Sequence, residues 1–379
     1  MKVDGNWLEH PGTQALCMAM EVAGYKALFV GGCVRNAILG ETVNDVDIAT
    51  DALPETVTLI AEKAGFKVVP TGIEHGTVTV IAEGRPHEVT TFRRDVETDG
   101  RRAIVAFSTH IEDDAARRDF TMNALYADRT GILIDPLNGL PDLIARQVRF
   151  VGNASERIQE DYLRILRFFR FHAYYGREDQ GIDPAGLAAC AEYSAGIETL
   201  SKERVGAEMR KLLLAPNPVP SVSIMAVAGV LARVLPGANP KALGPFLDLC
   251  EQNSHSANVI ARLVALGGEA PDDALRLSRS ETRNWLRLRD AAGSLASPGE
   301  LGYQLGQEDG LTALLLRAAF LETPVVGVTE LQKGAAAVFP VKAADLPGLS
   351  GANLGRELKR LERRWIASGF LLSRADLVG

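Results

Sequence analysis

The chain lacks the features that mark membrane, secreted and zinc-finger proteins. No apolar run approaches the ~18 residues that suggest a membrane span, and the first residues lack the basic-then-apolar pattern of a secretory signal. The four cysteines are scattered without a C-x-x-C pair, which fits reduced thiols better than a zinc site or a disulfide framework. We therefore expect a cytoplasmic protein with no membrane partner.

A strong positive charge is also missing. The formal net charge is −7 at pH 7, whereas phosphate contacts supply most of a protein's affinity for nucleic acids. Any RNA-binding surface must therefore be local. Residues 351–365 are one candidate, with a local charge of +3; a solvated helix face with i,i+4 ion pairs is the alternative.

Internal repeats and low-complexity tracts are absent, but the pattern changes along the chain. After Ala154, amphipathic helical stretches follow one another, separated by breaker clusters at 215–218 and 235–237. The part before it contains a helical stretch at 54–64 and short β-type runs. These runs are 27–30, 46–49, 77–81, 88–92 and 132–134. The sequence predicts an α+β protein whose sheet domain precedes an all-helical region.

Paired carboxylates stand in one of these runs, at Asp45 and Asp47. Alternate residues of a strand project from the same face, where two like charges destabilise a structural strand. Mg²⁺ removes the penalty, because it is commonly held by one or two carboxylates and substrate phosphates. Glu88, in a later run, is a candidate third carboxylate or an exposed strand acid. Gly31-Gly32, between a strand and a helix, would let backbone amides approach a triphosphate or form a plain tight turn.

These pieces resemble the nucleotidyltransferases of the DNA polymerase β superfamily, and further motifs narrow the resemblance to class II CCA-adding enzymes and bacterial poly(A) polymerases. It covers roughly residues 25–215. The motifs are, in order, Gly31-Gly32-x-Val34-Arg35, Asp45-x-Asp47, Arg117-Arg118-Asp119-Phe120-Thr121-Met122-Asn123-Ala124, Asp135-Pro136-x-x-Gly139-x-x-Asp142-Leu143, Glu160-Asp161-x-x-Arg164-x-x-Arg167-x-x-Arg170-Phe171 and Glu203-Arg204-Val205. Asn36 stands where the family usually has Asp, so it keeps an acceptor but loses the charge that would orient Arg35.

The resemblance implies a polymerase β-like head domain (1–150), a helical neck (151–215) and a helical body and tail that bind tRNA (216–379). Asp45, Asp47 and Glu88 would be catalytic, with Mg²⁺ on Asp45 and Asp47. Arg118 and Asp119 would line the nucleotide site near the ribose. The nucleotide-binding set it implies is Gly32, Arg35, Arg118, Asp119, Asp161, Arg164, Arg167 and Arg170.

Asp161 and Arg164 would read the incoming base, on one helix that also carries Arg167 and Arg170 at i,i+3 spacing. C and A each place an amino donor beside a ring-nitrogen acceptor on the pairing edge, whereas U and G place a carbonyl beside an N–H. One carboxylate and one guanidinium therefore accept C and A, and the other two bases would leave charged groups unpaired.

The implied activity is addition of CCA to the 3′ end of tRNA from CTP and ATP, with pyrophosphate leaving and no DNA partner. A poly(A) polymerase, or an enzyme that adds only CC or only A, shares the motifs. A catalytically silent RNA-binding module is the alternative of another class, although the intact Asp pair argues against it. The charged segment 93–103 is predicted to be a mobile, solvated loop, and by resemblance such a loop favours complete CCA addition.

Overall fold

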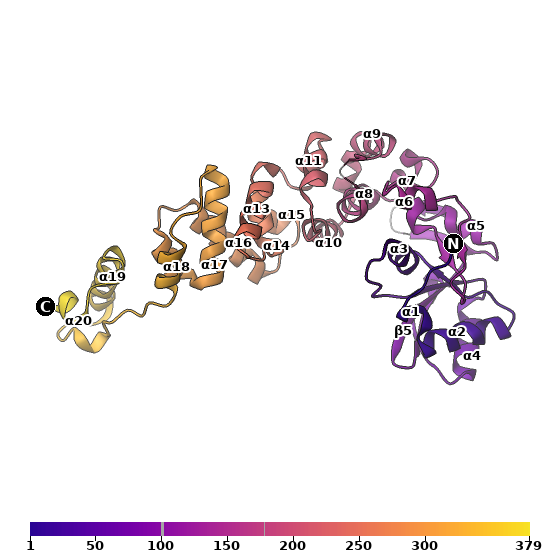
Figure 1. Ribbon diagram of the computed structural model, residues 1–379, viewed down its shortest axis with the longest axis horizontal. Coiled ribbons are helices and arrows are strands. Elements are labelled where there is room, and N and C mark those ends of the chain that lie inside the picture. The colour runs from indigo at the N-terminus through magenta and orange to yellow at the C-terminus, as the bar shows by residue number, and fades with distance from the viewer. Residues whose placement is uncertain (100–101, 178) are drawn as a thin grey trace. The chain divides into compact units, whose positions relative to one another are not determined.

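The computed structural model describes residues 1–99, 102–177 and 179–379. The chain divides into two compact units. The first holds Met1–Glu208 and Ala215–Arg233, and the second holds Met209–Leu214 and Val234–Gly379. All strands of the described residues belong to the first unit, in the indigo-to-magenta part of Figure 1. The division into head, neck and body at residues 150 and 215 stays a prediction.

A mixed seven-stranded sheet forms the base of the first unit, in the order β3-β4-β5-β2-β1-β8-β9. Among the described strands of this sheet, β2 and β5 pair in parallel and the other neighbours are antiparallel. The five expected β-type runs are confirmed as β1, β2, β4, β5 and β9. The bounds are β1 Leu28–Val30, β2 Asp47–Thr50, β3 Lys67–Gly72, β4 Thr77–Ala82, β5 Arg85–Thr91, β8 Tyr126–Ala127 and β9 Leu133–Ile134.

Alternating burial along the strands builds the core of the sheet. In β4, Val78, Val80 and Ala82 are buried while the residues between them are half-buried, as expected for a strand with one face on the core. Helix α4 begins at Pro54, whose fixed φ suits the first helical position. The helices of this unit are α1 Asn6–Glu9, α2 Pro11–Val22, α3 Gly32–Leu39, α4 Pro54–Lys63, α5 Ile111–Ala116, α6 Leu140–Ile144, α7 Ala154–Glu160, α8 Leu163–Tyr175, α9 Pro184–Glu192 and α11 Val219–Val227.

An aromatic cluster packs helix α8 against the segment that follows α5. The Phe120 ring lies 5.0 Å from the rings of both Phe150 and Phe171, measured between centroids. Phe150 also stacks on Phe168 at 5.3 Å. Burying such rings contributes about 2–3 kcal/mol each, so this cluster fixes where α8 lies relative to the sheet.

Helices and their connections make up the second unit, whose described residues include no strand beyond an isolated bridge between Ala238 and Gly267, which confirms the expectation for the later part of the chain. Helix α19 includes the basic segment 351–365, where Arg360 pairs with Glu357 at 2.7 Å. None of the described helices is both long and apolar enough to cross a membrane. The helices are α13 Leu243–Gln252, α14 Val259–Leu266, α15 Pro271–Ala274, α16 Arg279–Gly293, α17 Pro298–Leu321 with a break at Gly306, α18 Val328–Ala335, α19 Gly351–Ala367 and α20 Arg374–Val378; α10 Lys202–Leu213 and α12 Val230–Val234 have residues in both units.

The segment 93–103 is predicted to be a mobile, solvated loop, but in the residues that the structure describes it forms paired strands in place of a loop. Strands β6 (Arg93–Asp99) and β7 (Arg102–Phe107) pair in antiparallel fashion, and residues 100–101 lie outside the described residues. The segment and its continuation hold the β-branched residues Val96, Thr98, Ile104 and Val105. β-Branched residues favour strands, a preference that the many charges obscured.

A close helix crossing in the second unit yields a stability prediction. A Cβ added at Gly334 of α18 would lie 1.9 Å from the Gly299 carbonyl oxygen of α17, so one backbone would have to move. We expect Gly334→Ala to lower the free energy of unfolding by about 3 kcal/mol. The exposed Gly355 of α19 has open space around it, and Gly355→Ala should raise stability by up to about 1 kcal/mol. Calorimetric unfolding of both variants checks this; equal behaviour would contradict the close crossing.

Candidate active site

Two of the predicted carboxylates lie where β2, the middle strand of the seven, begins, and we call this end of the strands the sheet edge. Asp47 opens β2, and the parallel register pairs it directly with Glu88 of β5, so both side chains project from one face. Asp45 precedes the strand and is exposed, Val46 is buried, and Asp47 is half-buried. The structure thus brings Asp47 and Glu88 onto neighbouring strands, with Asp45 two residues away along the chain.

The acids leave uncompensated negative charge at Asp47. Burial, together with the charges of Glu88 and Asp45, raises the pKa of Asp47 to about 6, although Arg118 opposes the shift. A carboxylate that is hard to ionise among other acids gains stability when a cation binds beside it.

The residues present fit a metal ion that is completed by substrate. Among the described residues, no three His, Cys, Asp or Glu side chains form a ready metal-binding group. Mg²⁺ does not require one, because one or two carboxylates plus substrate phosphates are a common ligand set. Asp45 and Asp47 match that set, and Glu88 stays a prediction as a third carboxylate.

A glycine turn lies beside the half-buried Arg118, whose Nη1 would be 3.4 Å from a Cβ at Gly31. Gly31 has a positive φ of 71°, and Gly32 opens helix α3. Gly31 is therefore the residue whose positive φ favours glycine. The sequence alone did not distinguish it from Gly32. Arg118 donates to Asp114 at 2.8 Å and to the Tyr126 hydroxyl at 3.1 Å. The sequence reasoning missed Asp114, a buried acid four residues before Arg118.

Asp119 is buried with both oxygens engaged by the protein. One oxygen accepts hydrogen bonds from the Phe120 amide and the Asn123 side chain, each at 2.9 Å. The other accepts from Arg167, with the Nε bond at 2.8 Å. Burial favours the neutral acid, but Arg167 and these hydrogen bonds hold the pKa of Asp119 below its usual range. Its predicted role near the ribose stays a prediction.

Arg35 and Arg170 both approach the ring of Phe171. Their guanidinium carbons lie 5.2 and 4.5 Å from its centroid. Arg170 also donates to Glu208 at 2.6 Å. Asn36 accepts hydrogen bonds from Arg35 at 3.1 and 2.9 Å, so the asparagine keeps the acceptor that the arginine requires.

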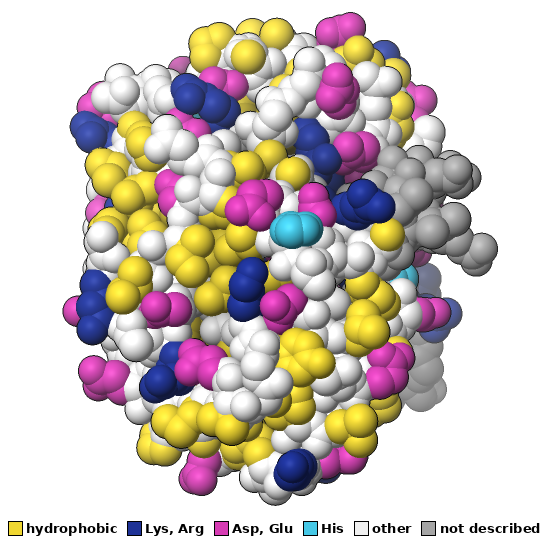
Figure 2. Space-filling model, turned by 90° about the vertical axis from the view of Figure 1, so that its right-hand side faces the viewer, with side chains coloured by type: hydrophobic (Ala, Val, Ile, Leu, Met, Phe, Trp, Pro, Cys, Tyr) yellow, Lys and Arg dark blue, Asp and Glu magenta, His cyan; other side chains and the backbone are white. Residues whose placement is uncertain are grey.

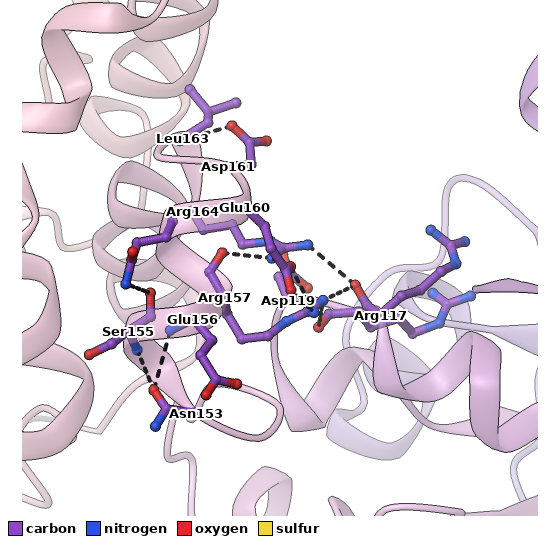
Figure 3. A network of polar contacts seen from close by, with 12 residues as sticks. Arg117, Asp119, Asn153, Ser155, Glu156, Arg157, Glu160, Asp161, Leu163 and Arg164 are labelled. Atoms are coloured by element: carbon purple, nitrogen blue, oxygen red, sulfur yellow. Dashed lines mark hydrogen bonds and ion pairs between the residues drawn. The ribbon is translucent and has the colours of Figure 1, made fainter. Parts of the chain in front are cut away.

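The two predicted base readers do not share one helix. Asp161 has an extended backbone between α7 and α8, and α8 begins at Leu163; the expectation of a single helix is wrong here. The Asp161 carboxylate accepts from Arg204 at 2.7 Å and from the Leu163 amide at 3.1 Å. The contact with the Leu163 amide, two residues on, is a local side-chain bond that competes with helical backbone, in keeping with the extended conformation of Asp161. In Figure 3 it lies beside Leu163, apart from the contacts of Arg164.

Arg164 belongs to a network of ion pairs and hydrogen bonds, with Glu160 and Arg157, that the sequence did not predict. It pairs with Glu160 and donates to the main-chain carbonyls of Arg157 at 2.7 Å and Arg117 at 3.3 Å (Figure 3). Arg157 pairs with the same Glu160 at 2.7 Å and donates to the carbonyls of Arg117 and Arg118. The loop before α8 is thereby fastened to the segment that carries Arg118 and Asp119.

The motif from Asp135 to Asp142 makes hydrogen bonds within itself and to the segment that carries Arg118 and Asp119. Its contacts therefore indicate a structural role. Asp135 accepts hydrogen bonds from the amides of Gly139 and Leu140, at 2.8 and 2.9 Å. Asp142 accepts from the Thr121 hydroxyl at 2.8 Å. A Cβ at Gly139 would lie 2.4 Å from the Thr121 carbonyl oxygen, so glycine is required there.

Positive and negative side chains are mixed on the face of the molecule that Figure 2 shows. On the face shown in Figure 2, the coloured Lys and Arg side chains are scattered among Asp and Glu instead of gathering into one field. This distribution agrees with the negative net charge of the chain.

Comparisons with known proteins cover nearly the whole chain. Residues 27–149 match the poly A polymerase head domain, and residues 181–241 match a probable RNA- and SrmB-binding site of polymerase A. The mitochondrial CCA tRNA nucleotidyltransferase 1 of Mus musculus is 30% identical over 97% of this chain and 89% of its own length. A CCA-adding enzyme of Streptococcus pyogenes is 44% identical over 59% of this chain and 54% of its own length. The crystal structure of the Bacillus stearothermophilus CCA-adding enzyme with CTP superimposes with a TM-score of 0.74 at 29% identity, covering 94% of this chain and 92% of that one.

The raised pKa of Asp47 predicts a pH-dependent effect on stability in the metal-free protein. The folded protein binds this proton more tightly than the unfolded chain, so stability falls as pH rises from about 4 to about 6. Asp47→Asn removes the buried charge and should raise the free energy of unfolding at pH 8 by about 1–2 kcal/mol. The gain should be small near pH 4, where Asp47 is neutral in the folded protein and only about half ionised in the unfolded chain.

Chemical denaturation with a chelator present, at pH 4 and pH 8, measures this difference. Glu55→Gln removes an exposed carboxylate of α4 and should change stability by less than about 0.5 kcal/mol at either pH. A loss of stability in Asp47→Asn at pH 8, or an equal gain at both pH values, would contradict the assignment of charge strain to Asp47.

Proposed function

The chain belongs to the family of CCA tRNA nucleotidyltransferases, and from that membership we propose how its residues carry out the reaction. The enzyme adds CCA to the 3′ end of tRNA from CTP and ATP and releases pyrophosphate. The observation that carries this conclusion is a relative at 30% identity that aligns with 97% of the chain. The carboxylates at the sheet edge, Asp45 and Asp47, and the base readers, Asp161 and Arg164, lie in the same compact unit.

We propose that Asp45 and Asp47 hold Mg²⁺, which when bound promotes ionisation of the RNA 3′-hydroxyl and neutralises charge that develops on the α-phosphate. The amide at Gly32 and the guanidinium groups of Arg35 and Arg118 position the nucleotide for in-line attack. Arg118 suits this role because Asp114 fixes its orientation from a buried position.

A reduced, cytoplasmic setting is supported by four free, buried cysteines.

Base selection falls to Asp161 and Arg164. An ionised carboxylate offers about four lone-pair sites, so Asp161 can accept the amino group of C or A while Arg204 and the Leu163 amide stay bound. Arg164 has to exchange its Glu160 contact for the ring nitrogen of the base. Glu160 keeps Arg157 as a partner when this happens, so its half-buried carboxylate is not left unpaired.

Substitution of the sheet-edge acids tests the chemistry. Asp45→Ala and Asp47→Ala should each abolish incorporation, because each removes a proposed metal ligand, while tRNA affinity stays near wild type. The assay supplies tRNA lacking CCA with all four nucleoside triphosphates and sequences the 3′ ends. The wild-type product should end in CCA, and Glu55→Ala should behave in the same way. Full incorporation by either Asp variant would contradict the metal assignment.

A second substitution tests base reading. Asp161→Ala should lower the selectivity for CTP over UTP by about ten- to hundredfold, because the acceptor for the amino group is lost. Incorporation of each triphosphate is measured separately. Glu156→Ala is a matched control, since Glu156 is an exposed acid of α7, the helix that directly precedes Asp161. Unchanged selectivity in Asp161→Ala would show that the carboxylate does not read the base.

A further inference from the structure

Arg35 differs from the other arginines of the proposed nucleotide site. The other four each pair with a carboxylate: Arg118 with Asp114, Arg164 with Glu160, Arg167 with Asp119 and Arg170 with Glu208. The ion pairs found among the described residues do not include Arg35, although it is 7% exposed. A buried cation without a carboxylate needs other groups to hold it in place.

Neutral side chains hold the Arg35 guanidinium in place. Asn36 accepts from Nε and Nη2 of Arg35, and the Asn123 side chain accepts from Nη1. The Tyr175 hydroxyl accepts from Nη2 at 2.7 Å. The ring of Tyr175 also lies 4.2 Å from the guanidinium carbon, closer than that of Phe171 at 5.2 Å. Tyr175 therefore holds Arg35 in two ways, by a hydrogen bond and by a cation–π contact.

Tyr175 reaches Arg35 from a different part of the fold. Arg35 lies on α3, which follows the glycine turn, whereas Tyr175 is the last residue of α8. The same helix carries Arg164 at its first turn and Arg167, which pairs with Asp119. The C-terminal end of α8 thus contacts Arg35, the arginine that we propose to bind the triphosphate.

We propose that Tyr175 is a positioning residue for the nucleotide: its hydroxyl and ring, together with Asn36, hold the Arg35 guanidinium toward the triphosphate. Three neutral acceptors, Asn36, Asn123 and Tyr175, share the Arg35 guanidinium, and Asn36 stands where the family usually has Asp. The proposal rests on the proposed function, since it takes the triphosphate of CTP or ATP as the group that Arg35 contacts. Both nucleotides carry this triphosphate, so the effect of Tyr175 must be common to them.

Steady-state kinetics with CTP and with ATP on tRNA acceptors test the proposal. Tyr175→Phe keeps the ring and removes the hydroxyl, so we expect KM for both nucleotides to rise about three- to tenfold by the same factor, with kcat within about twofold. Tyr175→Leu removes the ring as well and should raise KM further. Selectivity for CTP over UTP should not change, because Asp161 and Arg164 are untouched.

Rescue distinguishes positioning from a merely structural role. Asn36→Asp in the Tyr175→Phe background supplies a charged acceptor and should return KM to within about twofold of wild type. Tyr174→Phe makes the same chemical change at the neighbouring residue of α8, whose ring lies 6.0 Å from that of Tyr175, and should leave KM unaltered. Thermal midpoints of the Phe variants should agree with wild type within about 2 °C.

Three results would overturn the proposal: a wild-type KM in Tyr175→Phe, a change confined to one nucleotide, or a loss of stability and kcat that Asn36→Asp does not restore. A wild-type enzyme that fails to extend tRNA would instead contradict the proposed function. The two failures are therefore separated by the wild-type assay alone.

Discussion

The ion pair between the buried Asp119 and the half-buried Arg167 is the interaction on which the rest of the site depends. Arg167 lies on α8, and Asp119 lies on the segment that also carries Arg118. Through its second oxygen, Asp119 holds Asn123, which in turn accepts a hydrogen bond from Arg35. Removing Arg167 would leave the buried Asp119 carboxylate without a charged partner, which is strongly destabilising, so the pair fixes the helix and the sheet in one arrangement.

Around this pair, arginine side chains fasten the base-reading loop to main-chain carbonyls of the sheet domain. Arg157 and Arg164 both reach the carbonyl of Arg117, and Glu160 balances their charge. A guanidinium suits the task because its planar fork can serve two acceptors at once, which a lysine ammonium does with less directional control. These contacts hold the start of α8 against the segment that carries Arg118 and Asp119 within the first unit.

Local pattern was enough to predict much of this arrangement, and partners distant in sequence account for what it missed. Alternating apolar residues gave the central strands, and the spacing of Asp45 and Asp47 gave the acid pair. The parallel register that joins Asp47 to Glu88 is a tertiary fact, as is the contact of Tyr175 with Arg35, since 140 residues separate them. Periodicity also extended the base-reading helix too far, because a capping carboxylate at Asp161 has the same spacing as a helical one.

A crystal structure of the enzyme with CTP and Mg²⁺ tests the central claim most directly. The claim is that one carboxylate and one guanidinium read the base while the paired acids at the sheet edge hold the metal. We expect the cytosine amino group within hydrogen-bond distance of Asp161, its ring nitrogen facing Arg164 in place of Glu160, and the ion between the α-phosphate and the carboxylates of Asp45 and Asp47. A bound cytosine that contacts neither Asp161 nor Arg164, with Arg164 still on Glu160, would contradict it.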